Sequence, residues 1–373
     1  MSLVLEVEDD RLFAAVEEAA LRGARRGWFR AMHDDDLGAE IGEQHVHAID
    51  LLGLGRDNLV LVDTDALNRV DMSCLRAECQ RLQQEGIRPL AMVGIAGTTE
   101  TGNVDPLEQM AELAEEIGCH FHVDAAWGGP TLFSASHAHL LAGIERADSV
   151  TIDAHKQLYV PMGAGMTVFK DPTALSAIEH HANYILRHGS KDLGSHTLEG
   201  SRPGKALMLH AGLSIIGRKG YELLIDLGIE RAKSFAEMIQ RHPEFELTSA
   251  PELNILTYRY CPADVQKALK YASVEQDECV NLLLDQINQL LQKDQREAGK
   301  TFVSRTRLLV PSYARQITVL RVVLANPLTT DDILESVLAE QCTIVLQEDI
   351  QALLTQVEKI CASIDEPPVA CVL

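Results

Sequence analysis

The chain has 373 residues, a length that accommodates one large and one smaller domain. Its 33 basic and 55 acidic residues give a net charge of −22, so no nucleic-acid or membrane partner is expected. No apolar stretch reaches the length of a membrane span, and the start Met1-Ser-Leu lacks the features of a signal peptide. The eight cysteines form no CxxC pair, which is typical of a reduced protein, and we expect a cytoplasmic location.

The first half of the chain alternates short apolar stretches with amphipathic segments, the pattern of a mostly parallel α/β sheet covered by helices. The predicted elements are a helix over 11–32, a strand over 58–63, a helix over 71–85, a strand over 89–95, a helix over 106–117, and strands over 120–124, 148–153 and 164–169. Asp105 precedes Pro106, and these residue types suit the N-cap and the first helical position. We therefore expect the Asp105 side chain to cap the helix over 106–117.

From about residue 205 the pattern becomes that of an α+β domain. Helices are predicted over 205–216 and 221–239, separated by Gly217 and Gly220. The remaining predicted elements are strands near 245–249 and 253–260, a long helix near 263–293, strands near 302–309 and 318–325, and helices to about 362. The chain is thus expected to consist of a large α/β domain over 1–215 and a smaller C-terminal α+β domain over 216–373.

Two short segments place chemically active side chains at the ends of predicted strands. In His122-Val-Asp-Ala-Ala-Trp-Gly the apolar part ends at Asp124, and Ser149-Val-Thr-Ile-Asp-Ala-His-Lys ends at Lys156. The carboxyl ends of neighbouring strands in an open α/β sheet face the ligand crevice, so this carboxylate and this amine should converge there. Pyridoxal phosphate (PLP) needs such a pair, because an amine binds its aldehyde and a carboxylate pairs with its pyridinium nitrogen.

The strand with Asp124 also contains the alternation His120-x-His122-x-Asp124, which resembles a metal-binding pattern. No further set of ligand residues follows with zinc-like spacing. We therefore expect no metal.

The two segments resemble the group II PLP-dependent amino-acid decarboxylases, the family of glutamate, aspartate and aromatic amino-acid decarboxylases. The resemblance extends to the turn Gly97–Gly102 and to Leu320–Pro327 in the second domain. It implies a large PLP-binding domain of the PLP-dependent transferase type (fold type I), followed by a smaller C-terminal domain. The segment Leu193–Pro203 looks most similar to bacterial decarboxylases assigned to aspartate.

The resemblance implies roles for several residues at the cofactor. Lys156 would bind PLP covalently, Asp124 would keep the ring nitrogen protonated, and Ala126 would pack against one face of the ring. His155 and Asp153 would lie by the phosphate or the substrate. The remaining candidates for cofactor binding are Thr98 or Thr99 near the phenolic oxygen, and His45 as the ring-stacking histidine.

Two further residues are candidates for substrate binding and proton transfer. Arg321 matches the arginine that binds the substrate carboxylate in glutamate decarboxylases, and a guanidinium fork suits a carboxylate. The loop near 187–203 lacks the tyrosine that many family members use as a proton donor. His196 is the candidate in its place, with His188 or a water as alternatives.

The resemblance implies a homodimer that removes CO2 from an acidic amino acid, first L-aspartate to give β-alanine and second glutamate. Another fold-type I PLP enzyme, such as an aminotransferase, and a catalytically inactive paralogue are the alternatives. The family's Gly-rich phosphate-binding segment is not found upstream of residue 50, which favours the inactive paralogue. The presence of Asp124, Lys156 and Arg321 favours an enzyme.

Overall fold

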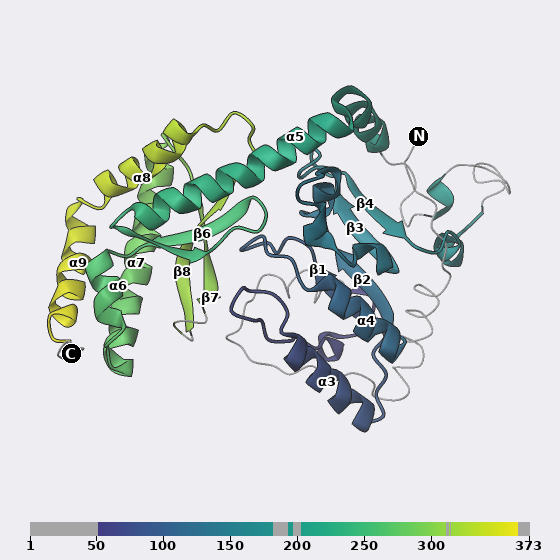
Figure 1. Ribbon diagram of the computed structural model, residues 1–373, viewed down its shortest axis with the longest axis horizontal. Coiled ribbons are helices and arrows are strands. Elements are labelled where there is room, and N and C mark those ends of the chain that lie inside the picture. The colour runs from purple at the N-terminus through teal and green to yellow at the C-terminus, as the bar shows by residue number, and fades with distance from the viewer. Residues whose placement is uncertain (1–50, 182–192, 197–202, 311–312, 314, 365–373) are drawn as a thin grey trace, which may run out of the picture. The chain divides into compact units, whose positions relative to one another are not determined.

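The structure is a computed structural model that describes residues 51–181, 193–196, 203–310, 313 and 315–364. The chain divides into two compact units between Asp226 and Leu227 (Figure 1). Each unit has its own β-sheet, and the two are described in turn. The helix predicted over 11–32 lies outside the described residues.

Unit 1 is built on a four-stranded sheet in the order β1-β2-β3-β4. Its strands are β1 (Ala91–Ile95), β2 (His120–Asp124), β3 (Ser149–Asp153) and β4 (Gly165–Phe169). Strands β1, β2 and β3 are parallel, whereas β4 pairs with β3 in the antiparallel direction. The predictions of these strands and of a mostly parallel α/β sheet are confirmed.

One face of this sheet is apolar, with Met92, Phe121 and Val123 buried on it. Helix α4 (Leu107–Ile117) packs against the sheet (Figure 1). The helix packs so closely over β1 that a Cβ at Gly94 would lie 2.9 Å from Leu107 Cδ2. Helix α4 ends where Gly118 adopts φ 72°, a left-handed conformation that glycine tolerates.

The prediction that Asp105 caps α4 is wrong. The helix begins at Leu107, with Pro106 as its N-cap residue and without a side-chain cap. Asp105 Oδ1 instead accepts a hydrogen bond from Val70 N at 2.8 Å, and Oδ2 accepts one from Ile95 N at 2.8 Å. Because Asp105 is buried, its carboxylate ties the end of β1 to the preceding segment from inside the unit.

The segment before β1 contains α3 (Met72–Gln84), as predicted. Asp71 caps this helix by accepting hydrogen bonds from two backbone N–H groups of the first turn. The strand predicted over 58–63 is wrong, because this region contains only an isolated bridge between Thr64 and Val70. An apolar run becomes a strand only when a neighbour pairs with it, and no described strand does so here.

Helix α5 (Lys205–Arg241) continues from unit 1 into unit 2. It is broken at Gly217, whose φ of 66° and ψ of 170° lie outside the helical region. This combination is accessible almost only to glycine, because a Cβ would clash with the backbone. The break confirms the two helices predicted on either side of Gly217.

Short 3-10 helices complete the described part of unit 1: η1 (Arg56–Asn58), η2 (Gly129–Phe133), η3 (Ala138–Leu141), η4 (Ile144–Arg146), η5 (Ala174–Ile178) and η6 (Leu193–His196). Gly143 precedes η4 with φ 97°. A Cβ at Gly143 would lie 2.4 Å from Glu108 N, so the chain approaches the start of α4 at a point where only glycine leaves room.

Unit 2 has an antiparallel four-stranded sheet in the order β5-β6-β8-β7. Its strands are β5 (Phe245–Ser249), β6 (Ile255–Tyr260), β7 (Ser304–Val310) and β8 (Arg315–Val323). Its helices are α6 (Ala263–Leu269), α7 (Val274–Ala298), α8 (Asp331–Ile344) and α9 (Glu348–Cys361), besides the end of α5. The predicted α+β character of this region is confirmed.

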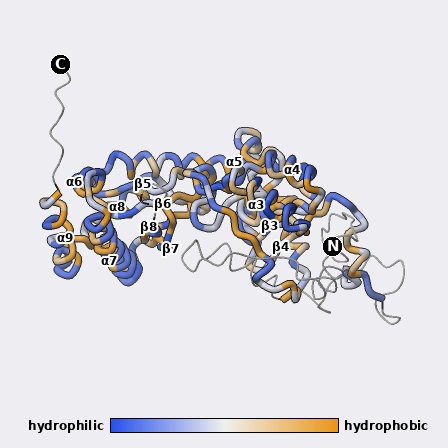
Figure 2. Tube along the Cα trace, turned by 90° about the horizontal axis from the view of Figure 1, so that it is seen from below, coloured by the Kyte–Doolittle hydropathy of each residue, from blue (hydrophilic) through white to orange (hydrophobic). Residues whose placement is uncertain are grey.

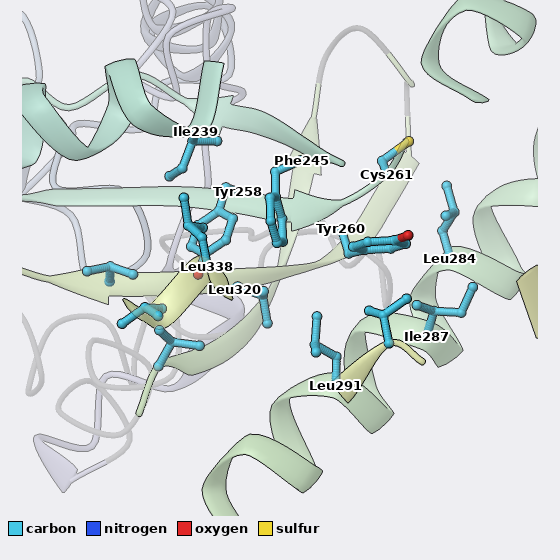
Figure 3. Packing of buried hydrophobic residues seen from close by; sticks show 14 of the residues in the cluster. Ile239, Phe245, Tyr258, Tyr260, Cys261, Leu284, Ile287, Leu291, Leu320 and Leu338 are labelled. Atoms are coloured by element: carbon cyan, nitrogen blue, oxygen red, sulfur yellow. The ribbon is translucent and has the colours of Figure 1, made fainter. Parts of the chain in front are cut away.

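Aromatic rings and aliphatic side chains form the core of unit 2 (Figure 3). Phe245 lies between Tyr258 and Tyr260, with each pair of ring centroids 5.7 Å apart in an edge-to-face arrangement. Ile287 of α7 is buried in the same cluster. The buried Tyr258 hydroxyl donates to Gln341 Oε1 at 3.0 Å, so its polar end is satisfied inside the core.

The single long helix predicted near 263–293 is wrong, since α6 and α7 are separate helices. Ser273 begins α7 with a capping box, in which its side chain accepts from Gln276 N and the Gln276 side chain accepts from Ser273 N. This reciprocal pair starts a second helix inside the segment that the sequence predicts as one helix.

Figure 2 shows hydrophilic and hydrophobic residues side by side along α7 and α9. In α7 the buried residues include Val280, Leu284, Ile287 and Leu291, which are spaced three or four residues apart. This is the pattern of a helix that buries one face. None of the described helices has an apolar stretch long enough to cross a bilayer.

We expect Gly143→Ala to lower the free energy of unfolding by about 2–4 kcal/mol, because it adds both backbone strain and a clash. Gly86→Ala is the matched control, since Gly86 has φ 73° but no atom within 4 Å of the added Cβ. Its loss should be only about 1 kcal/mol. Urea unfolding followed by circular dichroism measures both, and equal losses would contradict the close approach at Gly143.

Candidate active site

Several polar residues that the sequence predicts at the cofactor site lie at the carboxyl edge of the unit 1 sheet. Asp124 ends β2, and Asp153 ends the neighbouring strand β3. In the sheet register Asp124 lies beside Ile95 on one side and Thr151 on the other. The parallel strands β2 and β3 therefore present Asp124, Asp153 and the turn with Lys156 at the same edge.

Lys156 lies in a turn directly after β3, and its amine contacts Asp153. Lys156 Nζ is 3.0 Å from Asp153 Oδ2, and the two side chains are 35% and 19% exposed. The backbone N of Lys156 also donates to the Asp153 carbonyl, at 3.1 Å. Asp153 thus holds the amine at the sheet edge, where part of the lysine stays accessible to a small molecule.

His155 fastens the chain to the residue before β4. Its backbone N and its Nδ1 lie 3.2 and 3.0 Å from the Ala164 carbonyl oxygen. A carbonyl only accepts hydrogen bonds, so Nδ1 carries a hydrogen. Nε2 is 3.7 Å from Asp153 Oδ2, the oxygen that also contacts Lys156. Gly165 leaves room for this carboxylate, because a Cβ there would lie 2.9 Å from Asp153 Oδ1.

The residues after Asp124 form a tight turn that is tied to both neighbouring strands. Asp124 Oδ1 accepts a hydrogen bond from Ala126 N at 3.0 Å. The Ala126 carbonyl accepts one from Asp153 N at 3.2 Å, and Gly128 N donates to the Ala96 carbonyl at 2.9 Å. Backbone hydrogen bonds on both sides therefore place the predicted pair Asp124 and Ala126.

Gln157 positions the site, although the sequence pattern did not indicate it. Its side chain is 3% exposed, and Nε2 donates to the Trp127 carbonyl at 2.7 Å. Because Gln157 follows Lys156 directly, this bond joins the Lys156 turn to the Asp124 turn. The only signal in the sequence is an uncharged polar residue before the apolar Leu158, which does not distinguish a buried amide from an exposed one.

The turn after β1 contains the two threonines predicted at the cofactor. The buried Thr98 hydroxyl is 2.8 Å from Thr101 Oγ1 and accepts from Asn103 N at 3.1 Å. The Thr99 side chain is exposed. Thr98 therefore shapes the turn, and we infer that Thr99 is the better placed of the two to meet a ligand.

Two histidines on the same face of β2 share one serine. His120 Nε2 is 2.8 Å and His122 Nδ1 is 2.7 Å from Ser149 Oγ. His122 Nε2 is 3.4 Å from Thr151 Oγ1. Hydroxyl groups thus engage both imidazoles, and within the described ranges no group of three or more His, Cys, Asp or Glu side chains could hold a metal ion.

Three other predicted site residues lie elsewhere in the chain. His196 ends η6, where its Nδ1 is 2.9 Å from Ser195 Oγ. Arg321 is a half-buried residue of β8 in unit 2, in the part of the strand that pairs with β6 and β7. His45 lies outside the described residues. The roles of these three residues stay predictions.

Comparison with known proteins finds decarboxylases both among family models and among individual relatives. Residues 48–261 match the family model described as pyridoxal-dependent decarboxylase conserved domain. The chain is 55% identical over 312 residues to aspartate 1-decarboxylase of Aliivibrio fischeri, an alignment that covers 83% of this chain and 57% of the relative. It is 32% identical over 218 residues to L-2,4-diaminobutyrate decarboxylase of Rhizobium meliloti, covering 57% and 44%. The chain thus spans about half the length of these two relatives. A crystal structure of mouse CSAD superposes with a TM-score of 0.76 at 26% identity, covering 90% of this chain and 68% of that one.

A mostly parallel sheet with a lysine and a carboxylate at its carboxyl edge is the arrangement that PLP-dependent α/β enzymes use. Within this class, the chain belongs to the pyridoxal-dependent decarboxylase family, which confirms the resemblance seen in the sequence. The side chains at the edge fit the cofactor chemically. The Lys156 amine suits an aldehyde, and the Asp124 carboxylate, fixed by its bond to Ala126 N, suits a pyridinium nitrogen.

We expect Gln157→Leu to lower the free energy of unfolding by about 1–3 kcal/mol, because it removes a buried donor to the Trp127 carbonyl. Gln356→Leu is the matched control, since that exposed amide also donates to a backbone carbonyl, that of Ala352 at 3.3 Å. Its effect should stay within about 0.5 kcal/mol. Urea unfolding compares the two variants, and a wild-type value for Gln157→Leu would show that this bond does not hold the turn.

Proposed function

We propose that this chain carries out PLP-dependent α-decarboxylation of an acidic amino acid, with L-aspartate as the substrate and β-alanine and CO2 as the products. The observation that carries the proposal is the placement of the Lys156 turn and Asp124 on neighbouring parallel strands, at the same sheet edge. The aspartate 1-decarboxylase of Aliivibrio fischeri, 55% identical to this chain, supports aspartate as the substrate.

Three residues would serve the cofactor directly. When bound, PLP supplies an electron sink for the electron pair that remains after CO2 departs. Lys156 would hold it covalently through its amine. Asp124 would stabilise the proton on the ring nitrogen, because a nearby carboxylate favours the charged form of a base. Ala126 would leave room for the flat ring, since its side chain is a single methyl group.

Asp153 and His155 would position the Lys156 amine. The Asp153 carboxylate lies 3.0 Å from Nζ and holds it by a charge-assisted contact. His155 Nε2 lies 3.7 Å from the same carboxylate oxygen and would help to orient it. The resemblance places both residues by the phosphate or the substrate.

Arg321 and His196 would act on the substrate. Arg321 would bind the side-chain carboxylate of aspartate through its guanidinium fork. The α-carboxylate would then leave as CO2, its electron pair would stay on Cα, and a proton donated by His196 would complete β-alanine. Aspartate and glutamate differ by one methylene, a difference that a pocket distinguishes by only about 1–3 kcal/mol.

The protein would work as a homodimer in the cytoplasm. The unit 1 part of α5 exposes large apolar side chains, with Leu207 62%, Ile215 83% and Leu223 66% exposed. Covering such residues with a second copy would remove apolar surface from water. The cysteines in the described part of the chain are all unpaired, which suits a reducing compartment.

We expect the full chain, incubated with PLP and then reduced with borohydride, to carry the cofactor on Lys156, as located by peptide mass spectrometry. Lys156→Ala should carry none, whereas Lys170→Ala, which removes an exposed lysine of the same unit, should be labelled like the wild type. Asp124→Asn should still be labelled but should release CO2 more slowly, by a factor on the order of 100. An unlabelled Lys156 in the wild type would contradict the proposal.

We expect aspartate to give β-alanine faster than glutamate gives its decarboxylation product. Arg321→Met should lower kcat/KM for aspartate by roughly 10–100-fold, because a charge-assisted bond to the substrate is lost. Arg305→Met, which removes an exposed arginine of the neighbouring strand β7, is the control. A keto acid in place of CO2 would indicate an aminotransferase, and no product from any amino acid would indicate the inactive paralogue.

A further inference from the structure

The loop over residues 157–164 follows Lys156 and leads back to the sheet at β4. Helix α5 contacts this loop at two points. Tyr221 Oη donates to the Leu158 carbonyl, and Lys205 Nζ donates to the Met162 carbonyl. We propose that Tyr221 and Lys205 are positioning residues that hold the loop so that the Lys156 amine keeps its reactive place. This inference rests on the proposed function of Lys156.

The Tyr221 contact is fully buried. Its side chain is 0% exposed, and its hydroxyl donates to the Leu158 carbonyl at 3.1 Å. The ring stacks on Phe133 with centroids 5.6 Å apart, and a Cβ at Gly212 would lie 3.0 Å from the hydroxyl, so the phenol has little freedom to move. Burial raises the pKa of Tyr221, which keeps the hydroxyl protonated and therefore a donor.

Lys205 holds the loop four residues further along, where its ammonium group donates to the Met162 carbonyl. The next residue, Gly163, has φ 90°, and a Cβ there would lie 2.3 Å from Lys205 Nζ. The ammonium group thus occupies the space that a side chain at residue 163 would need. Glycine suits the positive φ at this position, and the bond from Lys205 to the Met162 carbonyl lies at the surface of the unit.

A strained residue lies between these two contacts. Tyr159 has φ 57°, a left-handed conformation that is unfavourable for a bulky residue other than glycine. Its backbone N donates to the Lys156 carbonyl at 3.1 Å and thereby closes the turn around the lysine. Such strain persists only where the surroundings hold it, and the bonds to Tyr221 and Lys205 lie on either side of Tyr159 in the chain.

Lys156 depends on this arrangement because its carbonyl is part of the strained turn. When the contacts from α5 are lost, Tyr159 keeps only local support, such as the bond from Val160 N to the Ala154 carbonyl at 3.1 Å, and we expect the turn to loosen. The amine then shifts from its place beside Asp153. A displacement of about 1 Å at a reacting group lowers a rate by a factor on the order of 100, so partial loosening should give a smaller but measurable loss.

The test uses Tyr221→Phe and Lys205→Met in the full chain, with two measurements. The first is the rate at which saturating PLP becomes attached to Lys156, trapped by borohydride. The second is amide hydrogen exchange over residues 157–164, recorded without cofactor. We expect attachment to slow by roughly tenfold and exchange in the loop to speed up in both variants. Lys205→Arg keeps a cationic donor and should restore both values.

Two control variants remove the same kinds of bond away from Lys156. Tyr258→Phe removes the buried hydroxyl that bonds to Gln341 in unit 2. Lys170→Met removes an ammonium group that donates to the Arg146 carbonyl at 3.3 Å. A merely structural contribution lowers the melting temperature alone, so these controls should leave the attachment rate and the exchange of residues 157–164 unchanged.

Unchanged exchange in the loop of both variants would overturn the proposal, as would a loss of attachment rate no larger than in the controls. If the wild type attaches no PLP, the proposed function is contradicted. If loop exchange is nevertheless faster in the variants, the result still supports a role of α5 in holding the loop. If Tyr221→Phe does not fold, Lys205→Met and its arginine rescue decide the question.

Discussion

The parallel pairing of β2 with β3 is the constraint on which the candidate site depends. Its register sets Asp124 beside Thr151, so the carboxylate and the turn that follows β3 meet at the same edge. A slip of one residue would turn Asp124 to the opposite face, where Phe121 and Val123 are buried. The apolar packing under α4 therefore fixes the register and keeps Asp124 on the other side of the sheet. An unpaired carboxylate in place of these apolar side chains would be unfavourable.

Remote polar side chains, rather than local sequence, stabilise the turns at this edge. Asp105 binds the backbone at the end of β1, Gln157 binds the turn after Asp124, and Tyr221 binds the loop after Lys156. All three side chains are buried, and each pairs with a backbone group that would otherwise lose a partner. Buried hydrogen bonds thus tie the loops of the candidate site to the interior of the unit.

The four strands of the unit 1 sheet and the positions of Asp124 and Lys156 at its carboxyl edge could be predicted from the sequence, because each apolar stretch is short and ends in a polar residue, whereas the apolar run over 58–63 forms no strand. The long-range hydrogen bonds that hold these strands and turns in place could not be predicted from the sequence. A carboxylate before a proline has the same local sequence whether it caps a helix or, like Asp105, binds a backbone N–H 35 residues away. Tyr221 and Lys205 likewise reach carbonyls 63 and 43 residues away. Periodicity and residue preference describe neighbours in sequence, so they carry no signal for such pairs.

Ser149 lies between two ring nitrogens but has only one hydroxyl hydrogen. If it donates to His120 Nε2, then His122 Nδ1 must supply the hydrogen of the other bond, and the reverse assignment exchanges both roles. For neutral rings, the first assignment places the hydrogen of both imidazoles on Nδ1 and the second places both on Nε2, so a change of tautomer in one ring requires the same change in the other. The strand face that leads to Asp124 thus behaves as one two-state hydrogen-bond unit rather than as two independent imidazoles.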